Sequence, residues 1–138
     1  MICAVIDTNV LVSNLISDRD SPPNKVFKAI KKGMIKPLYN AFLLNEYRRV
    51  LSEDRFGIDE RIVFNIVDFI ETYGEGVELI DFGSSLPDRK DSPIFDIVQS
   101  TREYDSFLVT GNTKHFPKED YVVTPRQMAD MLDDANAS

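Results

Sequence analysis

The feature that most constrains the fold is an alternation of short apolar runs with longer amphipathic segments along the whole chain. The first run, residues 2–6, is continuous and rich in β-branched side chains, as is typical of a central strand covered on both faces. Comparable short runs predict strands at residues 2–6, 35–39, 77–81, 106–110 and 121–123. Apolar residues at helical spacing predict helices at residues 23–34, 40–51, 59–73, 92–104 and 125–132. We therefore expect an α/β fold, a three-layer α/β/α sandwich with a central parallel sheet of about five strands.

The length of the chain limits it to one hydrophobic core. With 138 residues, 43% of them hydrophobic, we expect a single domain over residues 1–138, of which residues 133–138 form a frayed tail. Cys3 has no partner cysteine, so a disulfide framework and a thiolate metal cluster are excluded. Met1 leads directly into the first apolar run, and no run approaches the ~20 residues that span a bilayer. We expect a cytoplasmic protein with no membrane association.

The charge of the chain bears on its partners. The net charge is −7, but residues 1–50 hold 8 basic and 4 acidic side chains, whereas residues 51–138 hold 8 basic and 19 acidic ones. An acidic protein binds nucleic acid poorly in general, because affinity for a polyanion comes largely from Lys and Arg. Binding would need a divalent metal among the carboxylates, or the local basic cluster Lys25, Lys28, Lys31, Lys32 and Lys36. A lysine run on a helix is also typical of a solvated face, and both interpretations stay open.

Polar residues follow two of the predicted strands. Asp7, Thr8 and Asn9 come after the first strand, and Thr110, Gly111 and Asn112 after the fourth. In open parallel sheets, ligands bind beyond the carboxyl ends of the strands. Asp91 precedes a predicted helix and Glu46 interrupts an apolar helical stretch, so these side chains could converge on one cavity.

Converging carboxylates stay ionised together only if a cation joins them. Oxygen ligands select a hard ion, Mg²⁺ or Mn²⁺, and such an ion suits phosphodiester hydrolysis. Each acid also has a simpler explanation: Asp7 could cap a turn, Glu46 could be a solvated helix residue, and Asp91 could favour a helix N-terminus. The functional interpretation depends on their joint position at one sheet edge.

A series of motifs resembles PIN-domain proteins in the same order along nearly the whole chain. The motifs are Asp7-Thr8-Asn9-Val10-Leu11-Val12, Glu46-Tyr47-Arg48-Arg49-Val50-Leu51, Asp88-Arg89-Lys90-Asp91, Phe107-Leu108-Val109-Thr110-Gly111-Asn112 with His115-Phe116, and Val123-Thr124-Pro125-Arg126. The chain looks most similar to the PIN-family toxins of toxin-antitoxin pairs, which are related to VapC-like ribonucleases. The resemblance implies Mg²⁺- or Mn²⁺-dependent cleavage of single-stranded RNA, a cognate antitoxin protein that covers the site, and a homodimer.

The resemblance also assigns roles to residues. It makes Asp7, Glu46 and Asp91 the metal ligands and catalytic acids, with Thr8, Asn9 and Thr110 in support. Asp91 is preferred to Asp88 because its distance to the following helix fits the family spacing. Asp96 is a lesser candidate, since it lies on a different helical face from a residue that caps that helix.

Asn112 departs from the family pattern, which commonly has Asp at that position. The loss of one carboxylate implies a single-metal site, weaker metal affinity or low activity, although an Asn carbonyl oxygen can still bind a metal. The alternative function is therefore a PIN-fold RNA- or protein-binding module with little or no catalysis. Phosphotransfer on Asp7 fits poorly, because it would need a second acid where the chain has Asn9.

The remaining expectations concern RNA contacts by basic side chains and the burial of phenylalanines. The weaker candidates for RNA contact are Lys25, Lys28, Lys32, Arg49, Lys114 and His115. His115 could act as an acid or as a phosphate donor. It could instead be a loop residue that packs beside Phe116. We expect four phenylalanines at helical spacing to be core residues: Phe42, Phe64, Phe69 and Phe95.

Overall fold

The computed structural model of the chain describes residues 1–78 and 92–137. The strands of this part form one parallel sheet in the order β3-β2-β1-β4-β5. Their bounds are β1 (Ile2–Ile6), β2 (Ile35–Tyr39), β3 (Glu75–Gly76), β4 (Phe107–Val109) and β5 (Val122–Val123). The expected five-stranded parallel sheet is confirmed, with β1 at its centre.

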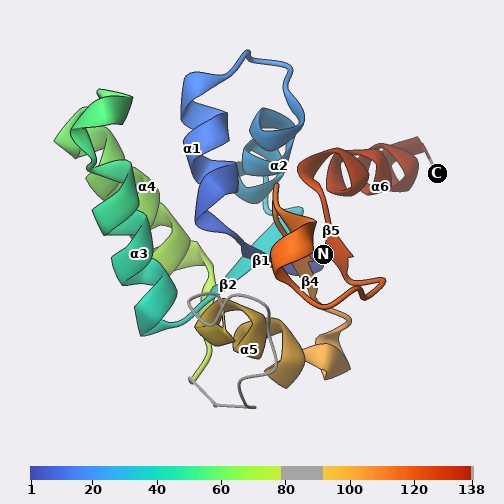
Figure 1. Cartoon of the computed structure of the whole chain (residues 1–138). Coiled ribbons are helices and arrows are strands. Elements are labelled where there is room, and N and C mark those ends of the chain that lie inside the picture. The colour runs from blue at the N-terminus through green and yellow to red at the C-terminus, as the bar shows by residue number, and fades with distance from the viewer. Residues whose placement is uncertain (79–91, 138) are drawn as a thin grey trace.

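Helices cover both faces of the sheet. Their bounds are α1 (Thr8–Ile16), α2 (Pro22–Lys31), α3 (Ala41–Leu51), α4 (Glu60–Tyr73), α5 (Ser92–Ser100) and α6 (Pro125–Ala137). Short 3-10 turns lie at η1 (Asp54–Phe56), η3 (Arg102–Tyr104) and η4 (Thr113–His115). Figure 1 shows α5 on one side of the sheet and α1, α2 and α6 on the other, while α3 and α4 pack together at one flank. The three-layer α/β/α prediction is confirmed.

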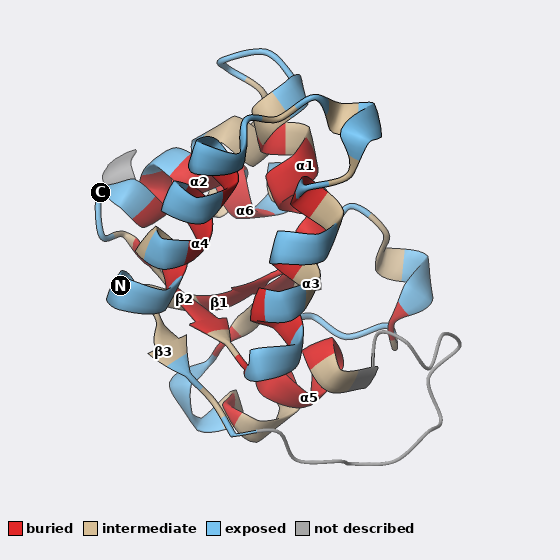
Figure 2. Ribbon diagram, turned by 90° about the vertical axis from the view of Figure 1, so that its left-hand side faces the viewer, coloured by how far each residue is buried: buried red, intermediate tan, exposed pale blue. Residues whose placement is uncertain are grey.

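The central strands are buried on both faces, which accounts for the uninterrupted apolar run of residues 2–6. Val5, Ile6, Leu38 and Leu108 are fully buried, because helices lie on both sides of β1, β2 and β4. Figure 2 shows the same pattern in the helices, which turn buried faces inward and exposed faces outward. No described helix has the length and apolar character that crossing a membrane would require.

The largest departure from the sequence prediction is α1, which we did not anticipate. Its first turn has no acidic residue, and Asp7, at the N-cap position, makes no side-chain capping hydrogen bond. β-Branched Val10 and Val12 also lower the helical signal of this segment. The usual marks of a helix start are therefore absent, because the Asp7 carboxylate accepts hydrogen bonds from other side chains.

Several element boundaries also differ from the prediction. Helix α2 begins one residue earlier, where Ser21 accepts a hydrogen bond from the Asn24 backbone N–H, and it ends at Lys31 rather than at residue 34. Gly33 takes a positive φ of 77° and turns the chain into β2, which only glycine does at low cost. Helix α6 runs to Ala137, so residues 133–137 are helical where we expected a frayed tail.

The third described strand begins two residues before the predicted one. Strand β3 is Glu75–Gly76, whereas residues 77–78 are not in a strand and residues 79–81 lie outside the described part. It lies at the sheet edge, where it pairs with β2 alone among the described strands.

The prediction of core positions is wrong for two of the four phenylalanines. Phe64 is 69% exposed on α4 and Phe42 is 38% exposed on α3. Phe95 is buried and Phe69 is partly buried, as expected. The apolar positions of α4 span a wider arc than the stripe that faces the core, and spacing alone does not show where that stripe ends.

Candidate active site

Asp7 is the best-determined acid of the predicted site. It follows β1 directly, and its backbone N–H donates to the Val109 carbonyl oxygen at 2.9 Å, which fixes it beside the end of β4. Its side chain is 7% exposed. Carboxylate Oδ2 accepts hydrogen bonds from Thr110 Oγ1 at 2.7 Å and from Asn9 Nδ2 at 3.2 Å. Two neighbours thus hold the carboxylate at the carboxyl edge of the sheet.

The segments after β1 and β4 are joined by further hydrogen bonds. The Gly111 N–H donates to Asn9 Oδ1 at 3.0 Å, and the Asn112 N–H donates to Thr110 Oγ1 at 3.0 Å. The two strands pair in register, with Ile6 opposite Val109. The expectation that the polar residues after the first and fourth strands meet is confirmed.

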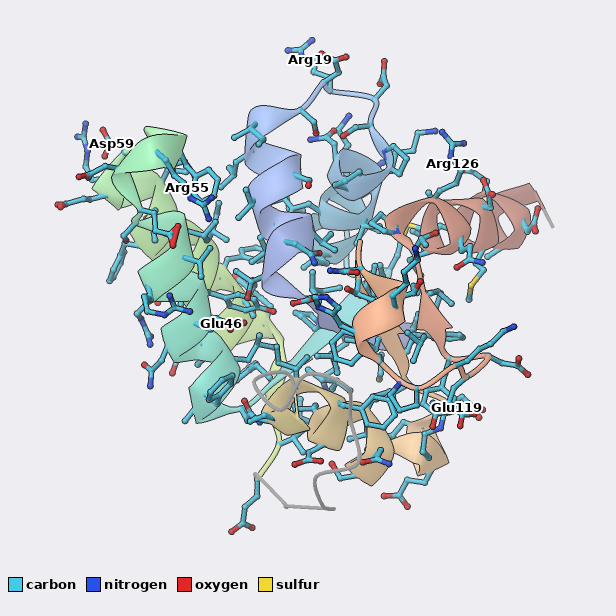
Figure 3. All side chains as sticks on the ribbon, in the orientation of Figure 1. Arg19, Glu46, Arg55, Asp59, Glu119 and Arg126 are labelled. Carbon is cyan, nitrogen blue, oxygen red and sulfur yellow. The ribbon has the colours of Figure 1, made fainter. Side chains whose placement is uncertain are left out.

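Glu46 reaches the same edge from α3. Its Oε2 accepts a hydrogen bond from Thr8 Oγ1 at 2.7 Å, and Arg49 Nη2 lies 3.9 Å from its Oε1. The Glu46 side chain is 18% exposed, whereas that of Arg49 is 68% exposed. Figure 3 shows Glu46 on α3 toward the start of α1. Thr8 therefore links this second carboxylate to the residue that follows Asp7.

Tyr47 fixes the helix that carries Glu46. It is fully buried, and its hydroxyl donates to the carbonyl oxygen of Ile6, the last residue of β1. This role of Tyr47 was not predicted from the sequence, where the residue stands only in the Glu46-Tyr47-Arg48-Arg49-Val50-Leu51 motif. The available signal was an aromatic residue with a polar tip directly after the candidate acid, since a buried tyrosine hydroxyl needs a partner.

The electrostatics of the site follow from burial and from the second acid. Burial raises the pKa of Asp7 above its usual 3.8, and the negative charge of Glu46 raises it further. The Thr110 hydroxyl, the Thr8 backbone N–H and the nearby charge of His115 act in the opposite direction. Burial, together with the charges of Asp7 and Glu46, also raises the pKa of Tyr47 well above 10, so its hydroxyl stays protonated as a donor.

The remaining predicted acids are Asp88, Asp91 and Asp96. Asp88 and Asp91 lie outside the described residues. Asp96 is buried on α5. Helix α5 begins near the end of β2, because Asn40 Nδ2 donates to the Pro93 carbonyl oxygen at 3.1 Å. Within residues 1–78 and 92–137, no three His, Cys, Asp or Glu side chains come together as a metal cluster.

Asn112 and His115 border the site from η4. The amide Nδ2 of Asn112 lies 3.2 Å from His115 Nδ1 and 3.1 Å from His115 Nε2. The His115 and Lys114 side chains are exposed. Two of the predicted RNA contacts therefore lie beside the carboxylates: His115, which interacts electrostatically with Asp7, and Arg49, which lies beside Glu46. Lys114 lines a separate pocket with Pro117 and Asp120.

The lysines of α2 lie elsewhere. Lys25, Lys28 and Lys32 line a small cavity of about 190 Å³ between α2 and α6. Two other members of the predicted cluster have structural partners: Lys31 Nζ lies 5.1 Å from the Phe27 ring centroid, and Lys36 Nζ lies 3.3 Å from Glu75 Oε1. The structure does not bring this cluster to the carboxylates.

The residues present suit a hard divalent cation. Asp7 and Glu46 offer carboxylate oxygens, the amides and hydroxyls around them add oxygen atoms, and no sulfur is among these neighbours. Since Glu46 disfavours ionisation of Asp7, a cation near both would be favoured electrostatically. The donor chemistry thus fits Mg²⁺ or Mn²⁺ with two acids from the described residues.

Comparison with known proteins adds one finding. A family model described as the PIN domain matches residues 3–114, more than half of the chain. The matched segment runs from β1 into η4 and so includes Asp7, Glu46 and Asn112. No curated protein matches the chain.

Proposed function

Because the chain belongs to the PIN domain family, which is associated with nuclease activity, we propose that it is a Mg²⁺- or Mn²⁺-dependent endoribonuclease. The observation that carries the proposal is the buried carboxylate of Asp7 facing Glu46 at the carboxyl edge of a parallel sheet. Two carboxylates held close together repel each other, which costs folding free energy. Binding of a cation offsets that cost.

In this proposal Asp7, Glu46 and Asp91 hold the cation. Asp91 enters through the resemblance in sequence. The cation supplies positive charge that stabilises the phosphate in the transition state and lowers the pKa of water. The protein's own contribution is to hold the acids in place: Thr110 and Asn9 bind one oxygen of Asp7, and Thr8 binds one oxygen of Glu46. Tyr47 fixes α3 against β1.

A second function is favoured by one observation. Asn112 stands where the family commonly has an acid, and its amide contacts the His115 ring. A site with fewer carboxylates binds a cation more weakly, so a PIN-fold module that binds RNA or protein with little catalysis is the alternative.

We further propose the biological setting that the resemblance implies. The chain would be the toxin of a toxin-antitoxin pair that acts in the cytoplasm, assembles as a homodimer and is inhibited by a cognate antitoxin over the catalytic edge. Expression of the chain alone should arrest growth, and coexpression of a neighbouring small open reading frame should relieve the arrest. Equal growth with and without the chain would contradict the toxin role while leaving the nuclease proposal standing.

The nuclease proposal is tested by cleavage of single-stranded RNA in a Mn²⁺ titration. Wild-type protein should cleave the strand as Mn²⁺ is added and stop when EDTA is present. The Asp7→Ala variant should not cleave, whereas Arg61→Ala should cleave as wild type does, because Arg61 is an exposed residue of α4 whose guanidinium lies 3.6 Å from Asp59. Cleavage that is unaffected by Asp7→Ala would contradict the proposal.

A further inference from the structure

The chain contains one histidine, His115, which lies in η4 near the carboxyl edge of the sheet. The turn is closed by two backbone hydrogen bonds, from the His115 N–H to the Asn112 carbonyl at 3.1 Å and from the Phe116 N–H to the Thr113 carbonyl at 3.2 Å. Phe116 anchors the turn in the core: it is 4% exposed and stacks on Phe95 with ring centroids 6.2 Å apart. The exposed ring of His115 is thus carried by a fixed backbone.

A chain of hydrogen bonds connects this turn to Asp7. Thr110 Oγ1 donates to Asp7 Oδ2, the Asn112 N–H donates to Thr110 Oγ1, and the Asn112 amide contacts both ring nitrogens of His115. The ring is also close enough to Asp7 to interact with it electrostatically. An anion that approaches Asp7 and Glu46 from solvent therefore approaches His115 as well.

The identity of residue 112 suits this contact. An asparagine amide donates to an unprotonated ring nitrogen, whereas an ionised aspartate accepts only. Asn112 can therefore hold the ring while a ring N–H points elsewhere. The side chain that departs from the family pattern contacts His115.

The protein also needs donors for a phosphate at this edge. The net charge is −7, and Asp7 and Glu46 add repulsion where the strand would bind. The exposed lysines of α2 line a cavity against α6 instead. His115 is beside the carboxylates, and a ring N–H is a suitable donor to a phosphate oxygen.

We infer that His115 donates a hydrogen bond to a phosphate oxygen of the RNA strand at the catalytic edge, and that Asn112 is the positioning residue that orients its ring. This inference rests on the proposed ribonuclease function and names the substrate contact that the function would use. It gives the side chain of Asn112 the role of orienting the His115 ring.

The single histidine makes a direct test possible, because all imidazole signals in an NMR spectrum belong to His115. Ring ¹⁵N and ¹H resonances of ¹⁵N-labelled wild-type protein are recorded in EDTA while a short oligouridylate is added. The ring resonances should shift with the same concentration dependence as the backbone amides of Thr110 and Gly111. Inorganic phosphate should shift the same ring signals at higher concentration, since it offers the same oxygens without the strand.

Cleavage kinetics in Mn²⁺ give the second readout. Loss of one exposed hydrogen bond to a charged phosphate should raise KM about tenfold in His115→Ala, with kcat changed by less than about twofold. His115→Gln, which keeps a donor, should recover most of the loss. Asn112→Ala should raise KM about threefold, and the double variant Asn112→Ala with His115→Ala should be no worse than His115→Ala alone, because Asn112 acts through the ring.

Controls separate this contact from a structural role. His115→Ala should unfold at the wild-type temperature, because the ring is exposed, and Arg61→Ala should leave KM unchanged. Wild-type protein that cleaves RNA while the ring signals stay in place, or additive effects of the two alanine variants, would overturn the inference alone. A protein that neither binds nor cleaves the strand would overturn both the inference and the proposed function.

Discussion

The carboxyl edge of the sheet and the lysine face of α2 are the two charged regions that the sequence offers, and they differ in how the fold uses them. At the edge, Asp7 is buried and held by two hydrogen bonds, and Glu46 is held by Thr8. On α2, Lys25, Lys28 and Lys32 line a cavity against α6. Concentration of charge in the sequence therefore does not show where the fold buries charged groups and holds them by hydrogen bonds.

The positions of the two regions along β1 reinforce the difference. Asp7 follows the last residue of β1, whereas the Met34 carbonyl, just after α2, accepts a hydrogen bond from the N–H of the first residue, Ile2, at 3.0 Å. Strands rise ~3.3 Å per residue, so the end of α2 and Asp7 lie near opposite ends of β1. If function follows the carboxyl edge rather than the lysine face, substitutions at the edge should have the larger effects on RNA cleavage.

The largest effect should come from Asp7. Asp7→Asn keeps the shape of the side chain but removes its charge, so RNA cleavage in Mn²⁺ should fall more than a hundredfold, beyond the loss typical of residues that only support a metal ligand. Initial cleavage rates of wild type and variant measure the effect. Retention of a tenth of the wild-type rate would show that the edge is not the catalytic region.

Replacement of Thr110 should have a smaller effect, which is seen in the affinity for Mn²⁺. Thr110→Val removes the hydroxyl that donates to Asp7 Oδ2, and Mn²⁺ affinity should fall about 10- to 100-fold. Isothermal titration with Mn²⁺ measures it. Thr110→Ser retains the hydroxyl and serves as the matched control; if Ser and Val lower the affinity equally, the hydrogen bond is not what holds Asp7.

Tyr47 should affect stability directly. Tyr47→Phe leaves the buried carbonyl of Ile6 without its donor, so the free energy of unfolding should fall by about 1–3 kcal/mol. Urea denaturation measures the change. Phe69→Leu, a partly buried aromatic on α4, provides a packing control that removes no hydrogen bond.

The pH dependence of stability should also report on Asp7. A carboxylate whose pKa is raised by folding destabilises the folded state when ionised, and the effect is absent below its unfolded pKa near 3.8. In EDTA, Asp7→Asn should therefore gain stability over wild type as the pH rises from 3.8, and the gain should level off above the folded pKa. Urea denaturation over a pH series measures it; a difference that shrinks as the pH rises would contradict the assignment.

The smallest effect should come from the lysine face. Simultaneous Lys25→Gln, Lys28→Gln and Lys32→Gln changes should alter kcat/KM for RNA by less than about threefold at physiological salt, because screening weakens charges far from the substrate. The matched comparison is Arg49→Gln, whose guanidinium lies 3.9 Å from Glu46 Oε1 and which should have the larger effect per charge removed. A loss from the α2 variant as large as that from Asp7→Asn would break the comparison between the two regions.

The sequence predicted the fold class and the meeting of the polar residues after the first and fourth strands, because the carboxyl ends of β1 and β4 lie side by side. The contact between Asp7 and Thr110 itself came from the structure. The sequence did not predict α1, since Asp7 binds Thr110 and Asn9 instead of capping the helix. It also placed Phe64 in the core, because spacing defines a helical stripe but not its width. The contact between Asn112 and His115 was not foreseen, since it depends on the turn geometry of η4.

The most direct test of the account is the effect of Mn²⁺ on the unfolding free energy of wild type and of Asp7→Asn at neutral pH. Without metal, the Asn variant should be the more stable protein, because it lacks a buried charge next to Glu46. With saturating Mn²⁺, the order should reverse, since binding stabilises only the protein that holds the cation. Equal stabilisation of both proteins by Mn²⁺, or none of either, would contradict the claim that Asp7 and Glu46 meet to bind a divalent cation.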